Sequence, residues 1–198
     1  MAPFDDLILA GRESPALEHK QSAQWEELRI ALIRTVLGMA NTRGGGNIVI
    51  GMTELDDKTF SADGMSEEHW SGFPPDEDFQ AKVNGFAEPF IEPRLERHEH
   101  EGRRFLVFTA PEFEYEPILC TKTEGQRLRE GALYVRSTRT PETVEARMPT
   151  DMRALMRLAT DKALGREIER LRVLGLLPRA QGASDTGSEA FARQIEDV

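Results

Sequence analysis

The sequence is poor in cysteine and in long hydrophobic runs, and each shortage excludes a class of protein. The single cysteine, Cys120, has no partner for an internal disulfide, cannot build a thiolate zinc site, and fits a reducing cytoplasm. No apolar run approaches the ~20 residues that cross a bilayer. Residues 1–10 carry Asp5 and Asp6 and lack the basic start of a signal peptide. We therefore expect a cytoplasmic protein that does not enter a membrane.

Basic charge is also scarce. The chain has 25 Lys and Arg against 35 Asp and Glu, a formal charge of −10. This balance argues against general affinity for nucleic-acid backbones, which depends on clustered cations. The distribution is uneven, however: residues 54–116 hold 17 acids and 6 bases, whereas residues 121–179 hold 13 bases and 8 acids. The first segment suits a protein partner, and the second leaves room for a basic face that contacts nucleic acid.

A Walker motif is absent as well, because no Gly-Lys-Ser or Gly-Lys-Thr follows Gly44–Gly46. A helical pattern stops at Asn41, and the β-branched run Ile48–Ile50 follows the glycines at once. Asn and Gly tolerate left-handed backbone at a helix end, and an unbroken apolar run is typical of a strand buried on both faces. We interpret the glycines as a tight structural turn in preference to a phosphate cradle.

The remaining patterns predict a mixed α+β domain with a mainly antiparallel sheet packed by helices. Apolar residues at three- and four-residue steps predict helices over 22–40, 76–86 and 149–174. A hairpin is expected from residues 94–100 and 103–110, further strands at 118–120 and 131–136, and an exposed connection over 56–75. The last helix either packs on the sheet or forms a dimer contact. The expected organisation is a domain over 1–160, a C-terminal helix over 161–178 and a flexible tail over 179–198.

Charged residues flank the glycine turn on both sides. Glu13, Glu18 and Lys20 precede the long helix, and Glu54 follows the central strand, with Asp56 and Asp57 close behind. Carboxylates brought to one point repel one another unless a cation neutralises them, and Mg²⁺ or Mn²⁺ is the natural partner for oxygen ligands. The alternative is that these acids are solvated surface groups.

Three motifs occur in an order that resembles the Schlafen AlbA_2 domain family. They are Glu18-x-Lys20, the turn Ala40-Asn41-Thr42-x-Gly44-Gly45 with the strand Ile48–Gly51, and Tyr134-Val135-Arg136-Ser137-x-Arg139-Thr140. The similarity covers residues 11–158. The family usually has an aromatic residue where this chain has His19, which is a departure from the first motif.

The resemblance implies a nucleic-acid-binding lobe and, for its nuclease members, a Mg²⁺- or Mn²⁺-dependent endoribonuclease that acts on tRNA-like RNA. In that case Glu13, Glu18 and Glu54 are the catalytic metal ligands, with Asp56 as a substitute for Glu54, and Lys20 offsets charge in the transition state. It also implies a homodimer, since related cores join two such lobes. The alternative is a non-catalytic DNA-binding or regulatory domain, or a protein-interaction subunit of a defence or regulatory assembly.

Outside the carboxylates, Lys20, Arg43, Arg136 and Arg139 are the expected nucleic-acid contacts. Arg136 and Arg139 have an equal alternative in ion pairs with Glu142 or Glu145. His98 and His100 alternate along a strand, and we expect them on a solvated strand face without a metal.

Overall fold

The computed structural model describes residues 4–137, 140 and 142–178. The expected tail over 179–198 lies outside this part of the chain. Two compact units divide at residue 160, with residues 1–160 forming the first and 161–198 the second. The helices and strands have the following bounds: α1 (Asp5–Leu9), β1 (Leu17–Lys20), α2 (Trp25–Ala40), β2 (Gly46–Ile50), β3 (Met52–Glu54), β4 (Phe60–Ala62), α3 (Glu67–Gly72), α4 (Asp76–Asn84), β5 (Ala87–Glu88), β6 (Arg94–His100), β7 (Arg103–Ala110), β8 (Leu119–Cys120), β9 (Tyr134–Arg136), β10 (Thr143–Glu145) and α5 (Pro149–Val173).

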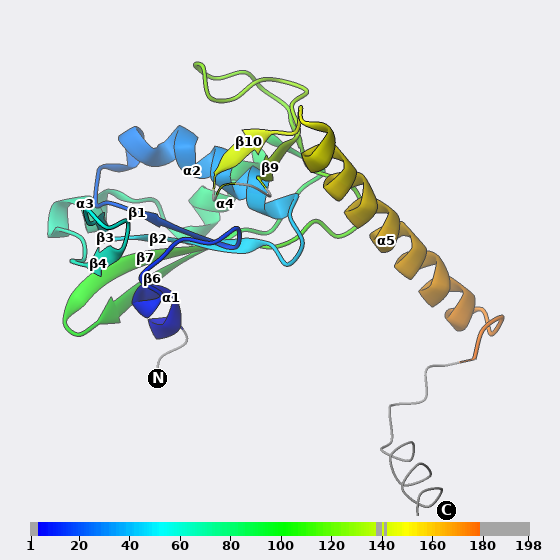
Figure 1. The fold of residues 1–198 in the computed structure, drawn as a ribbon, viewed down its shortest axis with the longest axis horizontal. Coiled ribbons are helices and arrows are strands. Elements are labelled where there is room, and N and C mark those ends of the chain that lie inside the picture. The colour runs from blue at the N-terminus through cyan, green and yellow to red at the C-terminus, as the bar shows by residue number, and fades with distance from the viewer. Residues whose placement is uncertain (1–3, 138–139, 141, 179–198) are drawn as a thin grey trace, which may run out of the picture. The chain divides into compact units, whose positions relative to one another are not determined.

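A four-stranded sheet in the order β1-β2-β7-β6 forms the centre of the first unit (Figure 1). Strands β1 and β2 are parallel and are connected through α2, whereas β2–β7 and β7–β6 are antiparallel. Three two-stranded pairs, β3–β4, β5–β8 and β9–β10, surround it and are all antiparallel. The fold is therefore the mixed, mainly antiparallel α+β arrangement expected from the sequence.

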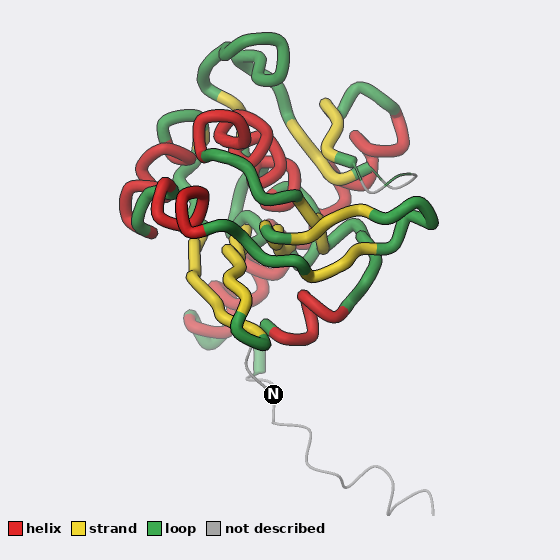
Figure 2. The backbone as a smooth tube through the Cα atoms, turned by 90° about the vertical axis from the view of Figure 1, so that its left-hand side faces the viewer, coloured by secondary structure: helices red, strands yellow, loops and turns green. Residues whose placement is uncertain are grey.

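Helices lie on both sides of this sheet, and strand alternation sends neighbouring residues to opposite faces (Figures 1 and 2). We call the side packed against α2 the α2 face and the side packed against α1 the α1 face. The larger core cluster includes the α2-face residues Ile48, Ile50, Leu95, Leu106 and Phe108. The smaller cluster consists of Ile8, Leu17, Val49, Met52 and Phe105, on the α1 face. Strand β2 is thus buried on both faces, as predicted.

The end of α2 is tied to distant strands through Asn41. Its side-chain amide donates to the carbonyl oxygens of Ile118 and Tyr134 at 2.8 and 2.9 Å, and its Oδ1 accepts from the Ile118 N–H at 2.7 Å. Asn41 is almost fully buried. These bonds satisfy all the polar atoms of a buried amide except one lone pair, so the helix end has one defined position.

The turn after α2 needs glycine for two reasons: the backbone conformation and the lack of room for a side chain. Gly44 and Gly45 have φ of +80° and +68°, a region that side-chain-bearing residues rarely adopt. A Cβ on Gly45 would lie 2.2 Å from the Ala110 carbonyl oxygen, and one on Gly46 would lie 2.8 Å from Met39 Sδ. This geometry supports the structural interpretation of the turn.

The segment 56–75 was expected to be an exposed connection, and that expectation is wrong in part. Strand β4 returns along β3 to form a short hairpin, with Glu54 opposite Phe60. Helix α3 follows, and the Ser66 side chain accepts from the His69 N–H at 3.2 Å. The Asp- and Ser-rich composition therefore marks a turn and a helix cap in addition to loop.

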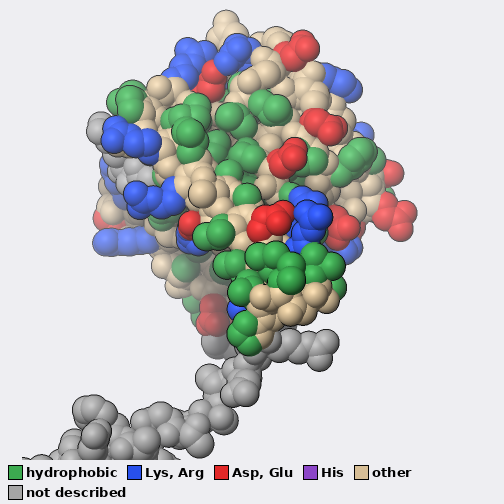
Figure 3. All heavy atoms as spheres, turned by 90° about the vertical axis from the view of Figure 1, so that its right-hand side faces the viewer, with side chains coloured by type: hydrophobic (Ala, Val, Ile, Leu, Met, Phe, Trp, Pro, Cys, Tyr) green, Lys and Arg blue, Asp and Glu red, His purple; other side chains and the backbone are tan. Residues whose placement is uncertain are grey.

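Helix α5 runs unbroken through Gly165. Within the first unit, Leu155 and Leu158 are buried in the larger core cluster. In the second unit, large apolar side chains are exposed: Leu164, Val173, Leu174, Leu176 and Leu177. Figure 3 shows hydrophobic side chains gathered beside the point where the described chain ends. In the part of the chain that is described, we find no helix of sufficient length and apolarity to cross a membrane.

Candidate functional site

A polar pocket of about 280 Å³ lies on the α2 face at the edge strand β1. Its walls come from four places in the chain: the segment before β1, β1 itself, α2, and the segments around β9 and β10. The residues that line it are Glu13, Glu18, Lys20, Ala31, Arg34, Thr35, Arg127, Glu142 and Thr143. Three carboxylates and three cations therefore face one small space. The pocket brings together Glu13, Glu18 and Lys20, three of the four residues proposed from the sequence as catalytic.

Glu18 is the buried acid of this pocket, with 8% of the residue exposed. Parallel pairing with Ile48 directs its side chain to the α2 face. One carboxylate oxygen contacts the Lys20 ammonium and the other contacts the Arg136 guanidinium. The Thr35 hydroxyl lies 3.4 Å from both oxygens. A buried carboxylate needs such partners, since the isolated charge would be strongly destabilising in the interior.

Arg136 holds this arrangement together, and its side chain has no exposed surface. Besides Glu18, it donates to the carbonyl oxygens of Pro15 and Ser14 at 3.2 and 3.4 Å, and to the Thr143 hydroxyl at 3.3 Å. Arg136 was expected to contact phosphate or to pair with Glu142 or Glu145; its side chain is instead enclosed by the fold and contacts Glu18. The guanidinium N–H groups of Arg136 donate to acceptors inside the fold.

Glu13 lies beside β1 because the chain reverses tightly between Ser14 and Leu17, whose backbone groups bond reciprocally at 3.0 and 3.1 Å. Its Oε1 accepts from the His19 N–H at 3.0 Å. Burial raises the pKa of the Glu13 carboxyl above its usual value, and the Glu18 charge adds to this. The hydrogen bond from His19 and the charges of Arg136 and Lys20 act in the opposite direction. Glu13 is thus a half-buried acid that pairs directly with no cation among the described residues.

The cations Arg34 and Arg127 were not singled out from the sequence. Arg34 lies on α2 with its guanidinium carbon 5.3 Å from the centre of the Tyr134 ring. Its Nε is buried and has no hydrogen-bond partner among the described residues. Arg127 comes from the segment between β8 and β9, and its side chain is exposed. Together with Lys20 they make up the three cationic side chains of the pocket lining.

The other expected site residues lie elsewhere. Glu54 and Asp56 are exposed in the β3–β4 hairpin and do not line the pocket. Arg43 is exposed in the turn after α2 and lines a second hollow beside the start of α5. Arg139 lies outside the described residues. The pocket therefore holds two of the expected acids and one of the expected cations.

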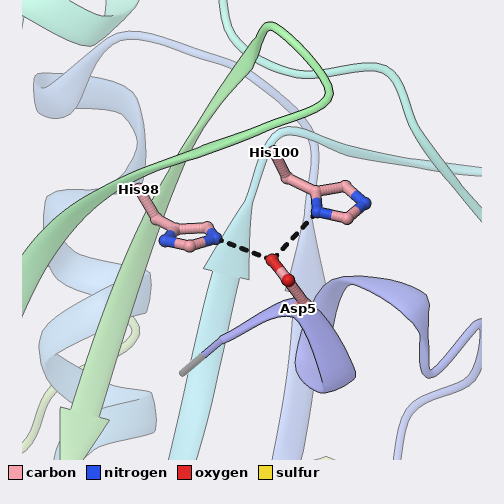
Figure 4. A group of neighbouring side chains, drawn as sticks. All are labelled: Asp5, His98 and His100. Carbon is pink, nitrogen blue, oxygen red and sulfur yellow. Dashed lines mark hydrogen bonds and ion pairs between the residues drawn. The ribbon is translucent and has the colours of Figure 1, made fainter. Parts of the chain in front are cut away.

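His98 and His100 do not occupy a solvated strand face, so that expectation is wrong. Both lie on the α1 face with side chains only 11% and 16% exposed. They contact Asp5, at the start of α1 (Figure 4). Within the described residues these three form the one group of three or more His, Cys, Asp or Glu side chains whose ligand atoms all lie within 4.8 Å of one another. Glu13, Glu18 and Glu54 do not form such a group.

The domain is a mixed α+β lobe in which a helix, a glycine turn and a central strand follow one another. A pocket lined by carboxylates and cations lies beside them. The chain belongs to the Schlafen, AlbA_2 family, whose sequence model matches residues 13–145. This range begins at Glu13 and ends at Glu145, so it includes every residue that lines the pocket.

Solved structures also resemble the chain, among them the following two. The DIP2311 protein from Corynebacterium diphtheriae is 16% identical with a TM-score of 0.46, and the match covers 73% of this chain and 26% of that one. The N-terminal domain of a protein from Nitrosomonas europaea, named as ATP-dependent DNA helicase RecG-related, is 20% identical with a TM-score of 0.44. That match covers 75% of this chain and 98% of the other. No curated protein shows significant sequence similarity to the chain.

Proposed function

We propose that this AlbA_2 domain binds nucleic acid, and that the pocket between β1 and α2 receives a phosphate of the backbone. The observation that carries the proposal is Arg34, whose buried Nε has no hydrogen-bond partner in the described chain. An unsatisfied buried donor is costly. Arg34 also lines the pocket, so a phosphate bound there would bring a charged acceptor to its guanidinium group. Lys20 and Arg127 line the same space.

The pairing inside the pocket explains how a protein of net charge −10 accepts a polyanion. Arg136 and Lys20 neutralise Glu18, so the acid that repels phosphate most directly is screened by internal partners. Arg34 and Arg127 then add two positive charges to the lining, which also holds the carboxylates of Glu13 and Glu142. Phosphate binding at this pocket would therefore depend on the local arrangement of cations more than on the net charge of the chain.

Direct titration tests the proposal. Fluorescence anisotropy with labelled tRNA, single-stranded RNA and duplex DNA compares the wild type with Arg34→Gln. We expect the substitution to weaken binding about 5- to 100-fold, in the range of one lost charge-assisted contact. Arg94→Gln is the matched control, because Arg94 is exposed at the opposite edge of the sheet. Equal affinity of Arg34→Gln and wild type would overturn the assignment of the pocket.

Metal-dependent RNA cleavage is a second candidate, favoured by the presence of Glu13 and Glu18 in one pocket. Mg²⁺ is commonly held by one or two carboxylates together with water and substrate phosphates, so the absence of Glu54 is compatible with a site. The residues do not fit a preformed one, however. Both oxygens of Glu18 already contact cations, and Lys20 would have to leave before a divalent ion could approach.

Cleavage assays decide between the two candidates. The protein is incubated with tRNA in Mg²⁺ or Mn²⁺ and compared with Glu13→Gln, which removes the acid without breaking an ion pair. Metal-dependent cleavage that is lost in Glu13→Gln supports the endoribonuclease. Binding without cleavage by the wild type supports a non-catalytic module. Homodimerisation, which the family resemblance implies, is part of the proposal and is tested by sedimentation equilibrium of the same sample.

A further inference from the structure

A second cluster of ligand-type side chains lies on the α1 face, which the phosphate pocket does not reach. Asp5 Oδ1 lies 3.1 Å from His98 Nε2 and 2.9 Å from His100 Nδ1. Figure 4 shows the two imidazole rings and the carboxylate directed toward one another, from β6 and from α1. The three side chains are 11 to 16% exposed, so the group is sheltered and still reachable from solvent.

The fold holds these side chains in place from both elements. Alternation along β6 puts His98 and His100 on one face, where His98 is opposite Phe105 of the smaller core. Helix α1 is fixed by Ile8, which is buried in the same core, and by the bond between His19 Nε2 and the Leu7 carbonyl oxygen at 3.1 Å. The position of Asp5 relative to the two rings thus depends on packing that the cluster itself does not supply.

Two imidazoles and one carboxylate form a donor set that suits zinc better than magnesium. Imidazole nitrogen is a preferred ligand of Zn²⁺, whereas Mg²⁺ takes oxygen donors almost exclusively. Zinc bonds to nitrogen and oxygen of ~2.0–2.2 Å at tetrahedral angles place neighbouring donor atoms about 3.4 Å apart. The two nitrogen–oxygen distances of 2.9 and 3.1 Å need to lengthen by only a few tenths of an ångström to reach that value.

We propose that Asp5, His98 and His100 bind a zinc ion, with one remaining position taken by water or an exogenous ligand. The three ligands would come from His98 Nε2, His100 Nδ1 and an Asp5 carboxylate oxygen. In the metal-bound form, each of these two nitrogens would exchange its hydrogen bond to Asp5 for a bond to the ion. The ion would join α1 to the β6–β7 hairpin across more than ninety positions of sequence, on the opposite face from Glu18.

Other zinc ligands in the described chain are unsuited to compete. Cys120, the single cysteine, is buried, and burial raises the pKa of its thiol. His69 bonds through Nδ1 to the Ser22 hydroxyl at 2.8 Å and does not belong to a group of three ligands. His69→Ala is therefore a suitable control, since it removes a histidine without touching the proposed site.

Isothermal titration with ZnCl₂ tests the site on the full chain, produced without a histidine tag and freed of metal with a chelator. We expect one zinc ion per chain and a rise in Tm of at least about 5 °C when free zinc is 100 times Kd. His98→Ala and His100→Ala should each weaken binding at least about 100-fold, beyond the effect typical of an outer partner. His69→Ala should bind as the wild type does.

Co²⁺ substitution provides a second readout that does not depend on stability. Its visible absorption reports ligand number, and we expect the spectrum of a four- or five-coordinate ion that Asp5→Asn alters and His69→Ala leaves unchanged. Circular dichroism of each variant establishes that it is folded before titration. Absence of stoichiometric zinc binding by the wild type, or unchanged binding by the folded His98→Ala and His100→Ala variants, would overturn the proposal.

Discussion

On the α2 face a buried carboxylate contacts two cations, whereas on the α1 face a carboxylate contacts two imidazoles. Glu18 is held by Arg136 and Lys20, and its charge is neutralised within the fold. Asp5 is held by His98 and His100, and imidazole is a side chain of a type that also binds metal ions. The alternation of a single sheet thus produces a permanent ionic cluster on one side and an adaptable donor set on the other.

The difference teaches which groups can change partners. An arginine guanidinium does not lose its proton, and Arg136 has no exposed surface, so its contact with Glu18 is structural. The histidines can exchange a hydrogen bond to Asp5 for a bond to a metal. We therefore expect stability to depend most on the α2 face and metal response to depend on the α1 face.

The largest effect is expected from Arg136→Met. The substitution leaves Glu18 buried with only Lys20 as a charged partner, and breaking a buried pair in this way costs about 3–5 kcal/mol of unfolding free energy. Urea denaturation at pH 7 measures it. Arg147→Met, which removes an exposed partner of Glu145, should cost at most about 1 kcal/mol. Equal losses in the two variants would contradict the structural role of Arg136.

A smaller loss is expected from Asp5→Ala in metal-free protein. The carboxylate accepts hydrogen bonds from two imidazoles, and their removal should cost about 1–3 kcal/mol. Hydrogen exchange locates the effect: amides of α1 should exchange faster, whereas those of β2 should remain protected. A loss as large as that of Arg136→Met would show that the two faces do not differ as described.

Glu13→Gln should change stability by less than about 1 kcal/mol at pH 7, because within the described part of the chain Glu13 accepts one hydrogen bond and forms no ion pair. The pKa of Glu13 is raised in the fold, so the folded state favours the protonated carboxyl. The resulting contribution to the free energy of unfolding is fully present below the unfolded-state pKa and is lost as pH rises through the folded-state pKa. The stability of Glu13→Gln relative to the wild type should therefore increase as pH rises above about 4.5. Denaturation curves from pH 4 to 7 measure this difference. A relative stability of the variant that falls as pH rises would contradict the prediction.

A pH dependence of opposite sign is expected on the α1 face. Burial lowers the pKa of His19, and the bond to the Leu7 carbonyl only partly opposes this. The unfolded chain then takes up a proton first, so stability is lost as pH falls from about 6.5 through the folded value, with a slope of at most about 1.4 kcal/mol per pH unit. Thermal unfolding of His19→Gln should not show this loss of stability as pH falls. An unchanged pH profile would exclude it.

Much of the fold could be predicted because its signals are local. The hairpin of β6 and β7 has the expected bounds, since Glu101-Gly102 separates two strand patterns. The central strand and the long helix α2 follow from an apolar run and a helical period. Strand β1 was not predicted, because Leu17–Lys20 has only one apolar residue and pairs in parallel with β2 across the whole of α2.

The candidate sites were less predictable because they depend on contacts distant in sequence. Glu13, Glu18 and Lys20 could be expected near the turn. Arg127 could not, since a loop far along the chain places it there. Arg34 has a local signal in the sequence, because it is the single cation within the mainly apolar run from Ile30 to Leu37. No local pattern links Asp5 to His98 and His100, because helix packing alone brings them together.

The salt dependence of RNA binding tests the central claim about the α2 face most directly. The slope of log Kd against log salt counts the phosphate charges that the protein neutralises. We predict that Arg34→Gln and Arg127→Gln each lower the magnitude of this slope by about one, while Arg94→Gln leaves it unchanged. A slope that is the same in the wild type and in both pocket variants would contradict the claim that this pocket receives the phosphate.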